Sequence, residues 1–270
     1  MNFDVATYQS VMNEIEQYLV KLRNSISVDI PDALTIAKKL PFIGFIPGQI
    51  ELIEWFAKIM IDICEWLLDK IIEILKGALA PYYMYTRSRD WNDVRGVVTS
   101  TQSSIDPNNL PAIRLWKGAA QQSYMRTATT QSAASGKLGD ISDKIKTTLL
   151  VSAGAGLAFY IGMALIVKQF LSALAMDIAL LAAGFTAAGG AADFLKTTGI
   201  TTAQITAAVA AIGVIVSNQA TALSDLEGLA SDNGTFPTGG DGKPTWPDAL
   251  ASTFSDASVE GDNESKWRLN

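Results

Sequence analysis

The sequence predicts an all-α protein: an elongated helical bundle in which a helical hairpin is flanked on both sides by apolar helices. Three observations carry this prediction. Apolar residues near the N-terminus recur in steps of three and four, the charges of residues 49–80 follow a single stripe, and residues 147–167 carry no charge at all. The expected organisation is residues 1–81 as amphipathic helices, 82–146 as the hairpin, 147–228 as an apolar helical region and 229–270 as a disordered acidic tail.

Amino-acid composition excludes several classes of function. The chain of 270 residues contains no histidine, so it lacks the commonest general base and the commonest zinc ligand. Its one cysteine, Cys64, rules out an internal disulfide, and its apolar neighbours indicate a buried side chain. The net charge of −6 argues against a nucleic-acid partner. We expect no cofactor, no metal site and no enzymatic activity.

The first helix is expected to be amphipathic. Its apolar residues, spaced by three and four, are Tyr8, Val11, Met12, Ile15, Tyr18, Leu19 and Leu22. Two glutamates and the missing basic region exclude a Sec signal peptide, so export would need a Sec-independent route. We expect a secreted or cell-envelope location if the protein is exported.

Residues 49–80 predict one long helix that ends at Pro81. Its charged residues fall on one narrow stripe: Glu51, Glu54, Lys58, Asp62, Glu65, Asp69, Glu73 and Lys76. One interpretation is a bundle helix with a narrow solvent face. The other is a helix that lies on lipid or on a partner through its wide apolar face.

Residues 82–146 predict a helical hairpin. Trp91, Val94, Val98 and Ile105 share one helical face, and the segment "DPNNLP" forms a turn. A second helix is expected to begin near Trp116-Lys117-Gly118, where glycine permits a tight approach between the helices.

This elbow resembles the Trp-x-Gly signature of the WXG superfamily, whose members are substrates of type VII (ESX) secretion systems. The resemblance rests on Trp116 and Gly118, with Tyr124 in the small-residue stretch that follows, and it looks like a long actinobacterial-type member. It implies recognition by type VII secretion machinery and a WXG-type helical partner or a homo-oligomer. No tyrosine here has an acid four residues later, so the export signal that family members often carry is missing.

The apolar region offers a possible membrane hairpin over residues 147–192. Residues 147–167 have the length needed to cross a bilayer core, and the connection is expected near Lys168. Gly154, Ala158 and Gly162 repeat at four and predict a face suited to close helix packing in lipid. The alternative is a buried, alanine-rich bundle core. The third uncharged tract, with its threonines and Gln204, is a poor spanning candidate.

Three hypotheses about function remain open. The first is a non-enzymatic type VII substrate or effector that is structural or membrane-associated after export. The second is an adaptor for a separately encoded toxin, or a soluble helical interaction protein. The third, an enzyme built on the carboxylates of Asp90, Asp93 and Asp106, is disfavoured because those acids belong to turns and helix surfaces.

Overall fold

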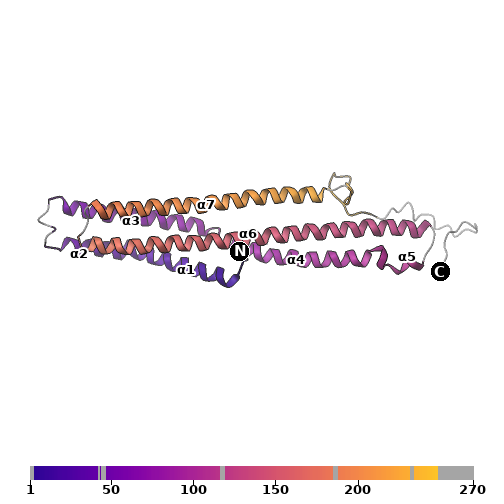
Figure 1. Ribbon diagram of the computed structural model, residues 1–270, viewed down its shortest axis with the longest axis horizontal. Coiled ribbons are helices and arrows are strands. Elements are labelled where there is room, and N and C mark those ends of the chain that lie inside the picture. The colour runs from indigo at the N-terminus through magenta and orange to yellow at the C-terminus, as the bar shows by residue number, and fades with distance from the viewer. Residues whose placement is uncertain are drawn as a thin grey trace, which may run out of the picture. The chain divides into compact units, whose positions relative to one another are not determined.

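The computed structural model describes residues 3–41, 43, 47–115, 119–184, 188–231 and 234–248. The fold class is all-α (Figure 1). Among these residues the one extended pairing is an isolated bridge between Thr238 and Pro244. The helices are α1 (Val5–Asn24), η1 (Ser25–Asp29, a π-helix), α2 (Ile30–Lys38), α3 (Gln49–Leu75), α4 (Ala80–Ile105), η3 (Pro107–Asn109, a 3₁₀-helix), α5 (Pro111–Leu115), α6 (Ala119–Ala182) and α7 (Ala188–Ala230).

The chain divides into two compact units. Unit 1 consists of residues 1–83 and 151–216, and unit 2 consists of residues 84–150 and 217–270. Both units are therefore built from segments that are separated in the sequence, and α6 contributes residues to each of them.

In unit 1 the predicted amphipathic helix is confirmed. Asp4 caps α1 by accepting a hydrogen bond from the Thr7 amide at 2.7 Å, which satisfies one of the free N–H groups of the first turn. The buried residues of α1 fall on the predicted stripe and are Tyr8, Val11, Ile15, Tyr18, Leu19 and Leu22.

Helix α3 buries one face and exposes both its charged stripe and large apolar residues beside that stripe, such as Trp55 and Trp66. Every charged residue of its predicted stripe is exposed. The opposite face is buried and consists of Ile53, Phe56, Ala57, Met60, Cys64, Leu67 and Ile71. Burial, followed by the nearby charge of Glu65, raises the pKa of the Cys64 thiol to about 12.

Pro81 does not end α3, contrary to the prediction. Helix α3 stops at Leu75, and Pro81 lies in the first turn of α4. Proline fits there because the first N–H groups of a helix have no intrahelical acceptor, so the missing donor costs nothing. The Pro81 side chain is buried.

The core of unit 1 joins three helices through aromatic rings. Phe194 of α7 lies 6.0 Å from Phe56 of α3 and 6.3 Å from Phe170 of α6, measured between ring centroids. None of these three rings is more than 1% exposed. A second aromatic contact joins Tyr8 of α1 to Tyr160 of α6, with 6.2 Å between their ring centroids, so α6 also packs against α1.

In unit 2 α4 and α6 run antiparallel, as the predicted hairpin requires. Ser132 Oγ donates to the carbonyl oxygen of Gln102 at 3.3 Å, and Ser135 Oγ donates to that of Val98 at 2.7 Å. The residue numbers rise along α6 while they fall along α4, which defines the antiparallel direction. Serine and glycine on α6 permit this close approach, because a side chain at Gly139 would meet Thr99 at 3.1 Å.

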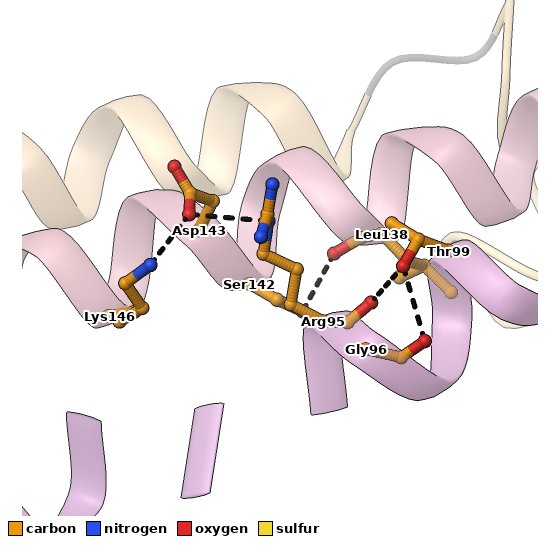
Figure 2. A network of polar contacts seen from close by, with 7 residues as sticks. All are labelled: Arg95, Gly96, Thr99, Leu138, Ser142, Asp143 and Lys146. Atoms are coloured by element: carbon orange, nitrogen blue, oxygen red, sulfur yellow. Dashed lines mark hydrogen bonds and ion pairs between the residues drawn. The ribbon is translucent and has the colours of Figure 1, made fainter. Parts of the chain in front are cut away.

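A polar network lies further along the same pair of helices (Figure 2). Asp143 accepts from Arg95 at 3.3 Å and from Lys146 at 3.1 Å. Arg95 and Asp143 are each about half exposed, so their ion pair orients the helices more than it stabilises them.

Of the segment predicted to be a disordered tail, residues 229–270, the structure describes residues 229–231 and 234–248. Helix α7 continues to Ala230, and beyond it the Thr245 amide donates to the carbonyl oxygen of Pro237 at 2.8 Å. Gln131 of α6 donates to the carbonyl oxygen of Pro247 at 2.9 Å, and Phe236 is only 6% exposed. Phe236 is thus the buried aromatic residue of this loop, whereas Trp246 is 40% exposed. Trp267 lies outside the described residues.

Candidate functional site

The elbow that carries the family resemblance is only partly described. Trp116 and Gly118 lie outside the described residues, between α5 and α6. Gln121, in the first turn of α6, donates to the carbonyl oxygen of Ile113 in α5 at 2.7 Å, so α5 is tied to the start of α6. Tyr124 lies on α6 and is half-buried.

The connection of the apolar hairpin was expected near Lys168, and that prediction is wrong. Helix α6 runs unbroken through Lys168 to Ala182, and the chain turns after it. Gly184 has a φ of 74°, a left-handed conformation that glycine adopts without strain. No proline or glycine interrupts residues 163–183, which explains the continuous helix, whereas the glycines from Gly184 onward are the signal that marks the turn.

The three residues of the predicted small-residue face differ in their surroundings. Gly154 is buried, but Ala158 is exposed, and a side chain at Gly162 would meet no atom within 4 Å. The close contact is instead at Gly156, where an added Cβ would lie 2.9 Å from Cβ of Pro81 and closer still to its Cγ. Sequence analysis missed Gly156 because its partner belongs to a distant helix end.

Within the part of the chain that the structure describes, two helices are long and apolar enough to cross a membrane, judged by length and composition alone. They differ in burial: the apolar window of α6 is 50% buried, whereas that of α7 is only 11% buried. The third uncharged tract, expected to be a poor spanning candidate, therefore lies in the less covered of the two helices.

Exposed apolar side chains lie on several sides of α7. Large residues with between 47% and 62% of their surface exposed are Leu195, Ile200, Val209, Val214, Val216 and Leu223. At 100° per residue these positions spread around most of the helix circumference. A helix that is apolar all round is normally covered by protein or by lipid.

The polar residues of α7 satisfy much of their own hydrogen bonding. Thr198, Thr202 and Thr206 each donate at 2.9 Å to the carbonyl oxygen four residues earlier. Because each hydroxyl already donates to a backbone carbonyl, it does not need water as a hydrogen-bond acceptor.

Of the three carboxylates considered for acid–base chemistry, Asp90 and Asp106 have structural partners, and Asp93 is exposed on α4. Asp90 forms an ion pair with Arg87 at 2.9 Å, and Asp106 accepts from the Asn108 amide at 2.8 Å at the start of η3. Within the described residues no group of three or more His, Cys, Asp or Glu side chains could hold a metal ion.

No protein-family model, no curated protein and no solved structure matches this chain.

Proposed function

We propose that this chain is an exported, non-enzymatic helical protein that associates with lipid bilayers, and that α7 is its lipid-contacting helix. The observation that carries the proposal is the low burial of α7: its apolar window is only 11% buried. An exposed apolar surface of this length favours a partner phase that covers it.

The distribution of charge along α7 fits lipid as that phase. No charged residue lies between Lys196 and Asp225. The 28 residues from Thr197 to Ser224 extend about 42 Å as a helix, whereas the hydrocarbon core of a bilayer is about 30 Å thick. The flanking Lys196 and Asp225 can therefore stay outside the hydrocarbon.

Hydrogen bonding within α7 lowers the cost of transfer to lipid. The uncharged tract of α7 contains six threonines, and a threonine hydroxyl that binds only water would lose its hydrogen-bond partner on entering lipid. Thr198, Thr202 and Thr206 instead bond to the helix backbone. Serine and threonine are tolerated in membrane helices for this reason.

Helix α6 is the second apolar helix, but the folded chain holds it in place. Tyr160 donates to the carbonyl oxygen of Ile74 at 3.3 Å, and Leu157 and Val167 are at most 1% exposed. Insertion of α6 would require it to leave α1 and α3. The buried residues of α7, such as Phe194 and Ile205, lie in its first half, and none of its residues after Ile205 is buried, so that part offers apolar surface to lipid in the folded chain.

The export part of the proposal rests on the Trp-x-Gly elbow and the antiparallel α4–α6 hairpin beside it. Fractionating native cells into cytosol, membrane and medium, with and without the secretion ATPase, tests it. Trp116→Ala and Gly118→Val should each reduce the exported fraction. If both variants are exported as well as the wild-type protein, or if export does not depend on the ATPase, the type VII assignment is refuted.

Vesicle flotation with a matched pair of variants tests the lipid part. Val214→Asp places a charge inside the uncharged tract of α7, at a cost of about 2.5–3.5 kcal/mol for a helix centre in lipid. Val20→Asp, on α1, makes the same change at a side chain of similar exposure, 64% against 61%. Because both positions are exposed, neither variant disturbs the core.

The expected result is that wild-type protein and Val20→Asp float with phosphatidylcholine vesicles and resist a high-salt wash, whereas Val214→Asp is washed off. If the wild-type protein does not float with vesicles of any lipid composition, the second candidate is favoured, which is a soluble helical interaction protein or toxin adaptor. The same exposed α7 surface would then bind a partner helix, and complex formation with that partner should be lost in Val214→Asp.

A further inference from the structure

Large apolar side chains are exposed at the end of unit 1 where α3 begins. They belong to the first turns of α3 and α7 and to the last turns of α6, and between 39% and 69% of each is exposed. We call this set the apolar end; it consists of Ile50, Leu52, Trp55, Met176, Leu180 and Leu195.

Contacts within unit 1 bring these helix ends together. Phe194, near the start of α7, packs against Phe56 near the start of α3 and against Phe170 in the last part of α6. Lys38, the last residue of α2, forms an ion pair with Glu54 of α3. Figure 1 shows the same end, where the beginning of α3 lies beside the start of α7.

The exposed side chains surround this end and do not form one flat face. Ile50 and Leu52 are two residues apart, so they point about 200° away from each other around α3. Met176 and Leu180 extend the surface onto α6, and Leu195 extends it onto α7. A second copy of the chain would cover one side of such a surface, whereas a bilayer covers all sides of an end that dips into it.

Charged residues set the lipid class and the depth. Among the side chains that the structure describes, this end carries three lysines (Lys38 and Lys39 at the end of α2, Lys196 beside Leu195) and three acids (Glu51 and Glu54 in α3, Asp177 beside Met176). Their charges cancel, and the Lys38–Glu54 ion pair neutralises one of each. No attraction to anionic lipid is expected, and the exposed Glu51 limits penetration to the interfacial region, about 5–10 Å deep. Trp55, which is 50% exposed, has the amphipathic ring that prefers that depth.

We infer that the apolar end is a docking surface for a zwitterionic bilayer, and that intact unit 1 meets the membrane with this end before α7 becomes wash-resistant. The inference rests on the proposed function and adds where, how deep and on which lipid the contact begins. It treats binding at this end and stable association of α7 as separable steps.

Neutral substitutions test it without changing the net charge. Met176→Gln/Leu180→Gln removes two exposed apolar side chains from the apolar end. Val20→Gln/Leu79→Gln removes two others, each 64% exposed, on α1 and in the turn that follows α3. Affinity for phosphatidylcholine vesicles should fall about tenfold or more in the first variant and stay unchanged in the second. Adding anionic lipid should not raise the affinity of the wild-type protein.

A site-specific probe gives a second measurement. Cys64 is buried, so a cysteine introduced at Leu180 or at Val20 can be labelled selectively in the folded protein with an environment-sensitive dye. The dye at position 180 should shift to the blue and brighten with phosphatidylcholine vesicles, and the dye at position 20 should not change.

The outcomes separate the two proposals. Flotation of Met176→Gln/Leu180→Gln equal to that of Val20→Gln/Leu79→Gln, or an unchanged dye at position 180, would overturn docking through the apolar end while lipid association stands. Binding that requires anionic lipid would also overturn it. If the wild-type protein is a dimer without lipid and Met176→Gln/Leu180→Gln is a monomer, this surface binds a second copy of the chain. Wild-type protein that fails to float would refute the proposed function itself.

Discussion

Replacing Gly156 with alanine should destabilise unit 1, although alanine is the better helix former. An added Cβ would lie 2.9 Å from Cβ of Pro81 and closer still to its Cγ, within a rigid ring that cannot rotate away. Overpacking of this kind costs about 1–3 kcal/mol. Helix propensity returns about 1 kcal/mol. We therefore expect a net loss of up to about 2 kcal/mol in the free energy of unfolding, because Pro81 and the start of α4 must shift.

Gly162→Ala is the matched control on the same helix. A Cβ there meets no atom within 4 Å, so only the propensity term remains and stability should rise by up to about 1 kcal/mol. Urea denaturation followed by circular dichroism measures both variants. If Gly156→Ala proves as stable as Gly162→Ala, the close packing of α6 against Pro81 does not exist in solution. If both variants lose stability equally, the open surroundings of Gly162 are wrong.

The remaining predictions concern the core, the thiol and the tail loop. Phe194→Ala should destabilise unit 1 by about 3–5 kcal/mol, because it removes the ring that contacts both Phe56 and Phe170; a loss below about 1 kcal/mol in urea unfolding would contradict this core. Cys64 should react with a thiol reagent near pH 8 only as fast as the chain unfolds, and rapid labelling of native protein would show that the thiol is not buried. The folded pKa of Cys64 is raised to about 12 from the usual 9.0, so its contribution to stability is complete below pH 9.0 and is lost as the pH rises toward 12. Comparing the pH dependence of wild-type protein and Cys64→Ala isolates that loss, and identical slopes above pH 9.0 would refute it. Phe236→Ala should expose the loop that follows α7 to limited proteolysis while leaving the helix content unchanged; protection equal to wild type would mean that Phe236 does not anchor the loop.

Much of the fold follows from local patterns in the sequence. The apolar spacing of α1 and the charged stripe of α3 each specify which face of a helix is buried, and both predictions are confirmed. The antiparallel α4–α6 pair follows from two helical patterns separated by the turn at residues 106–111.

Other features depend on contacts that a sequence does not display. The length of an uncharged tract does not fix where a helix ends, so the turn near Lys168 was misplaced although the glycines from Gly184 onward marked the true one. Spacing in fours identified Gly154, Ala158 and Gly162, but close packing depends on the partner, and Pro81 faces Gly156. The acidic composition of the tail gave no sign that Phe236 is buried or that Gln131 of α6 binds the carbonyl oxygen of Pro247. The family resemblance rests on Trp116 and Gly118, which lie outside the described residues, so it stays a prediction.

The discontinuous make-up of unit 1 affects how the chain can be synthesised. Residues 84–150 must be translated after the first helices of this unit and before the α6 and α7 residues that complete its core. At about 5–20 residues per second, a ribosome needs roughly 7–27 s to proceed from Tyr83 to Val216. Until Phe194 is translated, Phe56 of α3 lacks the aromatic ring that it contacts in the finished core, so the nascent chain presents an unfinished apolar surface. A chaperone that binds exposed apolar side chains would find Phe56 uncovered during this interval, whereas Phe194 covers it in the finished protein.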